Sequence, residues 1–294
     1  MSDIDRPEDE TPTPSRRDVC RAAAAAAALG AAGCRPASPI RDAERGSTAA
    51  VAPPASPGVA AKILARRSGE RGHADHGWLD TYHTFSFANY HDPNHMGFGP
   101  LRVLNQDRVT GGNGFPKHGH KDMEIVSYVL DGVMEHKDSM GNGSQMRPGD
   151  VQLMSAGDGV LHSEFNASRD ASLHFLQMWV LPAERETEPR YEQKAFTREE
   201  RSGALRLVVS PDGADGSLTI GQDARLYAGL FAAGEETRQA LGAGRGAWLH
   251  VATGSVEVNG QVFGPGDAAA LTDGDHFVVR GVEEAELVVW DVPV

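Results

Sequence analysis

The sequence has few cysteines and little positive charge, and both shortages narrow what the protein can do. Its 294 residues include two cysteines, Cys20 and Cys34, which both lie within the first 34 positions. The rest of the chain therefore has no disulfide, no cysteine-rich zinc site and no thiol nucleophile. The formal net charge is −13. Without a basic patch, a chain this acidic is not expected to bind nucleic acid.

The sequence also lacks an apolar run long enough to cross a bilayer. Its longest candidate, Ala22 to Gly33, has 12 residues, whereas a membrane-spanning helix needs roughly 20. Arg16 and Arg17 precede this run and Cys34 follows it, which resembles a twin-arginine signal peptide with a lipoprotein cleavage site. We therefore expect export of the folded protein to the periplasm, with Cys34 as a candidate lipid anchor. The alternative is an Ala-rich leader on a cytoplasmic protein.

Beyond this leader, the pattern predicts an all-β protein. A signal peptide is expected over 1–34 and a linker rich in Pro, Ala and Ser over 35–58. Short alternating apolar segments separated by turn residues then follow, with little helical periodicity. The clearest segments are 101–105, 124–130, 173–181, 247–253 and 285–292. We predict two small antiparallel β-barrels, an N-terminal domain over 59–185 and a C-terminal domain over 186–294.

An internal repeat supports the duplication. Gly132 lies between two apolar segments, and a Pro-Gly-Asp turn follows at 148–150. Gly254 and the Pro-Gly-Asp turn at 265–267 repeat this order. Two copies of one barrel are therefore expected.

Two pairs of potential metal ligands occur in the first copy. His118 and His120 are two residues apart, so on a strand both imidazoles point to the same face. His162 and Glu164 repeat this spacing, and Glu124 has the same parity as the first pair. Either pair alone is more often a surface feature, but two pairs on neighbouring strands of a narrow barrel would converge on one ion.

The second copy lacks these residues. Counted from the shared glycine and Pro-Gly-Asp turns, the positions of His118, His120 and His162 correspond to Ala240, Gly242 and Val279. We therefore expect the first barrel alone to bind metal.

The surroundings of the two pairs resemble the two cupin motifs, which span 112–132 and 149–166 in this chain. The likeness implies a small β-barrel with a metal at its mouth. Ser155 stands where the second motif usually has proline, and two spacings differ by one residue.

Longer stretches resemble the pirin family, in particular its bacterial members described as quercetin 2,3-dioxygenases. These stretches are 71–105, 118–143, 149–166, 173–182 and 189–196, and they extend over almost all of the chain from position 62. One departure is Gly119, since pirins usually have proline between the two histidines. The change should loosen the strand without removing a ligand.

The resemblance implies metal ligands at His118, His120, His162 and Glu164. General cupins commonly take their carboxylate from the position of Glu124, so we expect Glu124 to support the ligands or to be a spare. Glu164 or Glu124 is the expected proton acceptor in catalysis. The resemblance favours Fe(II), although Mn, Co, Ni, Cu and Zn also suit three imidazoles and one carboxylate.

The implied activity is a metal-dependent dioxygenase that opens the heterocyclic ring of a flavonol such as quercetin with O2. The expected partners are this aromatic substrate and O2, with no nucleic acid and no membrane contact except through Cys34, and the chain is expected to be a monomer. The alternative is a metal-dependent redox-sensing or protein-binding module without turnover. A scaffold with an idle site is a third option.

Other conspicuous residues have structural interpretations. We expect hydrogen-bonding histidines in the N-terminal segment, one of which could line the barrel mouth, core aromatic residues beside them, and a solvated His136. The histidines are His73, His76, His83, His91 and His95, and the aromatic residues are Trp78, Phe85 and Phe87.

Overall fold

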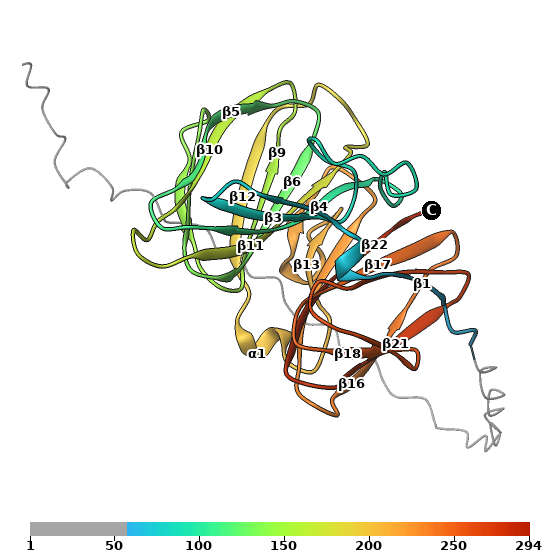
Figure 1. Ribbon diagram of the computed structural model, residues 1–294. Coiled ribbons are helices and arrows are strands. Elements are labelled where there is room, and N and C mark those ends of the chain that lie inside the picture. Colours follow the sequence, from blue (N-terminus) through green and yellow to red (C-terminus); the bar gives the residue numbers. More distant parts are fainter. Residues whose placement is uncertain (1–57) are drawn as a thin grey trace, which may run out of the picture. The chain divides into compact units, whose positions relative to one another are not determined.

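The computed structural model describes residues 58–294, which form an almost entirely β-stranded structure (Figure 1). The helical elements are the four-residue α1 (Arg198–Arg201) and two single 3₁₀ turns, η1 (Ser68–Glu70) and η2 (Ala214–Gly216). In this part of the chain, no helix has the length and apolar character to cross a membrane. The all-β prediction is confirmed. The predicted signal peptide, the lipid anchor at Cys34 and nearly all of the linker lie outside the described residues.

A seven-stranded and a four-stranded sheet together form what we call the N-terminal sheet pair. The larger sheet has the order β12-β9-β6-β11-β4-β3-β2 and the smaller β5-β10-β7-β8. The strands of the larger sheet are β12 (Arg190–Ala195), β9 (Asp150–Ser155), β6 (Glu124–Asp131), β11 (Leu173–Val180), β4 (Leu101–Val109), β3 (Leu79–His83) and β2 (Gly72–Asp75). Those of the smaller sheet are β5 (Gly114–His120), β10 (Val160–Asn166), β7 (Met134–Asp138) and β8 (Gly143–Met146).

The C-terminal sheet pair has the same construction. Its larger sheet has the order β1-β20-β17-β22-β15-β13-β14 and its smaller sheet β16-β21-β18-β19. The larger sheet contains β1 (Lys62–Arg66), β20 (Ala268–Thr272), β17 (Arg245–Thr253), β22 (Ala285–Pro293), β15 (Arg225–Phe231), β13 (Arg206–Ser210) and β14 (Leu218–Thr219). The smaller contains β16 (Glu236–Ala240), β21 (His276–Gly281), β18 (Val256–Val258) and β19 (Gln261–Phe263).

The two sheet pairs confirm the duplication. Gly132 lies in the turn between β6 and β7, and Gly254 in the turn between β17 and β18. Both glycines have positive φ, +82° and +67°, a conformation that other residues rarely adopt. The first Pro-Gly-Asp turn ends at Asp150, the first residue of β9, and the second ends at Asp267, immediately before β20. All five apolar segments predicted as strands lie in strands of the larger sheets.

The sheet pairs exchange one strand each. β1 pairs with β20 of the C-terminal sheet pair, although the predicted boundaries assign it to the N-terminal domain. Conversely, β12 pairs with β9 of the N-terminal sheet pair, although it follows the predicted boundary at residue 185. Each exchanged strand covers an edge that would otherwise present unpaired backbone groups. Strand pairing therefore crosses the boundary that composition and repeats suggest.

One buried apolar cluster contains residues from both sheet pairs. Val126 and Met178 of the N-terminal pair lie in the same cluster as Trp248 and Trp290 of the C-terminal pair. The Trp290 indole Nε1 donates to the Met178 sulfur at 3.2 Å. This shared core supports β6 and β11, the strands that flank the site described next.

Candidate metal centre

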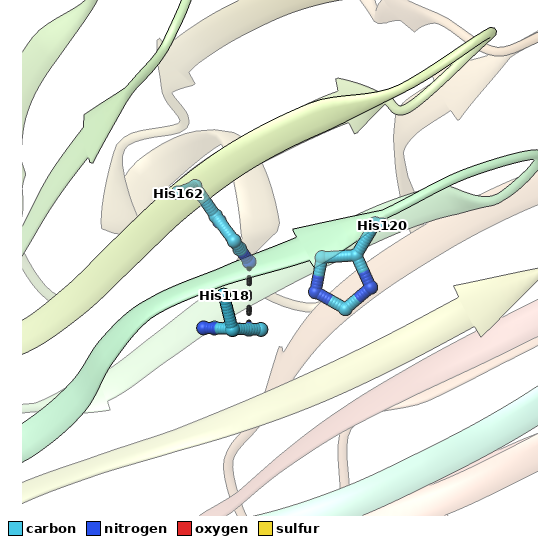
Figure 2. A group of neighbouring side chains, drawn as sticks. All are labelled: His118, His120 and His162. Atoms are coloured by element: carbon cyan, nitrogen blue, oxygen red, sulfur yellow. Dashed lines mark hydrogen bonds between the residues drawn. The ribbon is translucent and has the colours of Figure 1, made fainter.

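The two predicted histidine segments lie on adjacent strands of the smaller N-terminal sheet. β5 carries His118 and His120, and its antiparallel neighbour β10 carries His162 directly opposite His118. Figure 2 shows the three imidazoles facing one another, with the Nε2 atoms of His118 and His162 at 3.0 Å. One ring nitrogen from each residue lies within 4.8 Å of the others. The structure therefore brings the three predicted histidine ligands together.

Local hydrogen bonding leaves nitrogen lone pairs available at this cluster. Nδ1 of His118 donates to the carbonyl of Pro116 at 2.8 Å, which in the neutral ring leaves Nε2 with a lone pair. Burial, followed by the neighbouring imidazoles, lowers the pKa of His120 to about 4 and that of His162 to about 3. Both rings are thus neutral at pH 7. Three imidazoles directed at one point fit a transition-metal ion.

A β-bulge shapes this part of β5. His162 faces His118 and Glu164 faces Phe115, so two residues of β5 oppose one of β10. Pro116 is one of the two, and proline has no N–H for the ladder, which makes a bulge a suitable place for it. The bulge frees the Pro116 carbonyl that orients His118.

Glu164 is buried beside the histidines. Its side chain belongs to a second group of ligand atoms within 4.8 Å, together with His162 and His136. Ser127 Oγ donates to Oε1 at 3.2 Å and Gln177 Nε2 to Oε2 at 2.9 Å. Two neutral donors hold the carboxylate in place, and no cationic side chain among residues 58–294 forms an ion pair with it. A bound cation would supply that charge.

Glu124 lies away from the imidazoles. Its Oε2 accepts from Ser155 Oγ at 2.8 Å and from the backbone N–H of Gly221 at 3.2 Å. The parity argument does not hold here because the chain turns after His120 and Glu124 begins β6, a strand of the other sheet. Ser155, which replaces the usual proline of the cupin motif, is thus the hydrogen-bond partner of this buried carboxylate.

His136 is buried, so the expectation that it is solvated is wrong. Its side chain is 0% exposed, and its Nε2 lies 3.2 Å from Asp138 Oδ2. The ring stacks on Tyr191 with centroids 5.0 Å apart and lies 5.4 Å from the ring of His162. The strand signal was present in the sequence, since His136 shares the parity of the buried Met134 on β7.

A cavity of about 250 Å³ opens beside the histidines, and aromatic side chains form part of its lining. Phe87, Phe115 and Trp179 contribute to its walls, and Trp179 also packs edge-on against His120 with centroids 5.0 Å apart. Phe87 was expected in the core and instead lines this cavity. His76 and His83 also line it, which agrees with the prediction that a histidine of the N-terminal segment reaches the site.

Asp107 is a cavity residue that the sequence analysis missed. It is 3% exposed, and its Oδ1 has no hydrogen-bond partner in the described structure. Burial raises its pKa to about 7, with a further contribution from Glu164. The sequence does contain a signal for this position. Asp107 has the same parity on β4 as the buried Val103, Asn105 and Val109, and an acid on the buried face of a strand is unusual.

The C-terminal sheet pair has no corresponding cluster. Both groups of three ligand side chains found among residues 58–294 contain His162. In the equivalent strands, Val279 of β21 faces Thr237 of β16. Thr237 faces Val279 as His118 faces His162. The residue that corresponds to His118 is therefore Thr237 and not the predicted Ala240. Neither residue is a ligand for a soft or borderline metal.

Two sheet pairs with an imidazole and carboxylate cluster in the first are the features of a cupin protein. Residues 64–180 match the pirin model and residues 207–292 the model of the quercetinase C-terminal cupin domain. The chain belongs to the pirin family.

Individual relatives resemble nearly the whole described part. The chain is 46% identical over 231 residues to the quercetin 2,3-dioxygenase of Escherichia coli K12, an alignment that covers 79% of this chain and 99% of that protein. It is 43% identical over 222 residues to a pirin-like protein of Caulobacter vibrioides, covering 75% and 95%. The crystal structure of a bacterial pirin from E. coli in complex with nickel(II) superposes with a TM-score of 0.75, at 45% identity and coverage of 79% and 99%.

Proposed function

We propose that this protein is a metal-dependent dioxygenase that opens the heterocyclic ring of a flavonol such as quercetin with O2. The observation that carries the proposal is the cluster of three imidazoles, with the buried carboxylate of Glu164 near His162, beside a cavity lined in part by Phe87, Phe115 and Trp179. The printed activity of the E. coli relative, at 46% identity, supports the same reaction. Each sheet pair would close into the small barrel that the cupin likeness implies.

The proposed ligands are His118, His120, His162 and Glu164. Three nitrogen donors and one oxygen donor suit a divalent first-row ion, and the nickel(II) complex of the E. coli pirin supports a divalent ion at such a site. We favour Fe(II), in keeping with the family likeness. When bound, the ion would acidify an enolic hydroxyl of the substrate and permit electron exchange with O2.

The cavity residues would bind and orient the substrate. Phe115 and Trp179 offer ring faces and edges against which a planar flavonol can pack. Asp107 lines the same cavity, its Oδ1 has no hydrogen-bond partner among the described residues, and it would take the proton of the flavonol hydroxyl. Glu164 is less suited to this role because both of its oxygens already accept hydrogen bonds. Glu124 is held by Ser155 and Gly221 instead of facing the cavity.

Anaerobic reconstitution with single metals, followed by quercetin and O2, tests the activity. We expect loss of the flavonol absorbance together with release of carbon monoxide. Glu124→Gln should leave turnover within about threefold of the wild type, because this residue lies outside the cavity. Full metal occupancy without turnover for every divalent ion tried would refute the dioxygenase and favour a metal-dependent binding module.

Replacement of Asp107 by asparagine should lower kcat by about 10²- to 10⁴-fold, the usual contribution of a positioned base. The pH dependence is a second readout. The wild-type rate should rise with pH as the carboxylate ionises, because burial raises the pKa of Asp107, and the variant should lose this limb. An unchanged pH profile in Asp107→Asn would exclude Asp107 as the base.

The same variant should be more stable than the wild type in alkaline, metal-free buffer. The pKa of Asp107 rises from 3.8 to about 7 on folding, so the folded state binds the proton more tightly and its stability falls as pH rises between these values. At pH 8 the variant should gain up to about 4 kcal/mol, since one pKa unit corresponds to about 1.4 kcal/mol. Urea unfolding at pH 8 and pH 4 should show the gain at pH 8 alone.

We also propose that the protein is exported. The support is the paired Arg16 and Arg17 before the short apolar run that ends at Cys34. Cell fractionation of the Arg16→Lys, Arg17→Lys double variant should show cytoplasmic retention. An unchanged distribution would contradict a twin-arginine signal.

A further inference from the structure

A second cavity, separate from the metal site, lies between the two sheet pairs. It has a volume of about 390 Å³, and we call it the seam cavity. Tyr82, Gln106 and Arg108 of the N-terminal pair form one wall, and the segments around Gly254 and Gly266 form the other. Gln106 joins the walls because its Nε2 donates to the carbonyl of Ala252 at 3.1 Å.

The seam cavity and the metal-site cavity lie on opposite faces of the same two strands. On β3, Asp80 and Tyr82 line the seam cavity, whereas Thr81 and His83 line the metal-site cavity. Successive side chains of a strand point to opposite faces, which accounts for this division. Gln106 and Arg108 alternate with Asn105 and Asp107 on β4 in the same way. The two cavities have no lining residue in common.

Arg71 is a buried cation in the seam cavity without an acidic partner. Its side chain belongs to a residue only 9% exposed, and no carboxylate of the described residues lies within salt-bridge distance of its guanidinium. The nearby Asp267 instead pairs with Arg67 at 2.8 Å. Burial lowers the pKa of Arg71 to about 10. Buried charges are normally paired, so this arginine lacks the anion that would compensate it.

The guanidinium is held in place by neutral groups and retains free donors. Nη1 donates to Gln106 Oε1 and Nη2 to Ser68 Oγ, both at 3.1 Å, and Nε makes a longer bond to the Ser68 carbonyl. The guanidinium carbon lies 4.7 Å from the centre of the Tyr82 ring. Two of its five N–H groups therefore have no partner among the described residues. Planar paired donors of this kind match a carboxylate or a phosphate.

The close approach of Arg71 to the opposite wall depends on a glycine. A Cβ at Gly266 would lie 2.3 Å from Nη2 of Arg71, and this glycine has φ +78°. The other charges of the cavity are an exposed cation, Arg108, and one acid, Asp80, whose Oδ1 is 2.7 Å from His73 Nε2. His174 accepts from Gln106 through Nε2 at 3.0 Å, which leaves its Nδ1–H as a further donor. The lining thus has two cationic side chains, Arg71 and Arg108, and one acidic side chain, Asp80.

We propose that the seam cavity binds a small organic anion through a carboxylate or phosphate group, with Arg71 as its main partner and Arg108 at the entrance. The ligand would contact both sheet pairs and stabilise their association. This site does not depend on the metal or on the reaction proposed above.

This site can be tested by adding citrate or inorganic phosphate to the full-length protein and measuring binding by calorimetric titration and stability by thermal unfolding. Chloride at matched ionic strength is the reference. We expect at least one of the two anions to bind in a 1:1 ratio and to raise the melting temperature. The anion that binds distinguishes a carboxylate from a phosphate ligand. A dissociation constant above about 10 mM for both would overturn the proposal.

Two variants assign the site to its residues. Arg71→Met should weaken binding at least tenfold, and Arg108→Met, which changes an exposed side chain, should weaken it three- to tenfold. Arg169→Met removes the same charge from an exposed position outside the cavity and should not change the affinity. Equal losses of affinity in Arg108→Met and Arg169→Met would show nonspecific screening and contradict the site. The site would also be contradicted if Arg71→Met or Arg108→Met lost no affinity.

Discussion

Replacement of His162 by alanine is expected to lower the affinity for a divalent ion more than 100-fold. His162 belongs to both groups of ligand atoms. On β10 it lies opposite His118 and two residues before Glu164. Loss of a residue that merely supports a ligand typically costs 10- to 100-fold in metal affinity, so loss of a ligand should cost more. Competition with a chromophoric chelator, combined with ion analysis of the purified protein, measures the change.

A histidine outside the cluster provides the control for this experiment. His91 is exposed and lines neither cavity, so His91→Ala should bind metal as the wild type does. Circular dichroism should show the same β content for both variants. If His162→Ala retained wild-type occupancy and affinity, the ligand assignment would be wrong, and the dioxygenase proposal would lose its basis.

The second large effect concerns a largely buried ion pair between Arg201 and Glu286, with side chains 6% and 16% exposed, which contacts the N-terminal sheet pair through Tyr128. Arg201 is the last residue of α1, and its Nη1 donates to Glu286 Oε1 on β22 at 2.6 Å. The same Nη1 also donates to the hydroxyl of Tyr128 on β6. Tyr128 donates to the same carboxylate oxygen at 2.5 Å. Arg201→Met would leave this carboxylate without its cation. Removing one partner of a buried pair typically destabilises a protein by about 3–5 kcal/mol, which is the loss expected in urea unfolding at pH 7.

Two further variants separate charge from packing. Arg198 lies on the same short helix but forms an exposed ion pair with Glu284, with the two side chains 62% and 74% exposed. Arg198→Met should therefore change stability by less than about 1 kcal/mol. The double variant Arg201→Met, Glu286→Gln should recover part of the loss because it leaves no unpaired charge. A loss below about 1 kcal/mol in Arg201→Met would show that the pair contributes little.

The strands and the histidine cluster could be predicted because they depend on local geometry. Residues two apart on a strand share a face, so His118 with His120 and His162 with Glu164 were recognisable as pairs. The family likeness then chose between Glu164 and Glu124. The structure shows why counting alone could not, since a turn and a change of sheet separate Glu124 from His120.

Features that depend on contacts between distant strands could not be predicted in this way. Asp107 lines the metal-site cavity from β4, and His136 lies near His162 from β7. The alternation around them indicates that they are buried but not which distant residues they meet. The exchange of β1 and β12 between sheet pairs likewise requires the paired edges to be known. Arg71 is one of many arginines in the sequence, and only burial without an acid distinguishes it.

The most direct test of the central claim is the structure of the coordination sphere in the metal-loaded protein. X-ray absorption at the metal edge, with anomalous diffraction to locate the ion, would report both ligand types and position. We expect one ion bound by three imidazole nitrogens, from His118, His120 and His162, and by a carboxylate oxygen of Glu164. An ion with fewer than three imidazole ligands, or one located away from β5 and β10, would contradict the account.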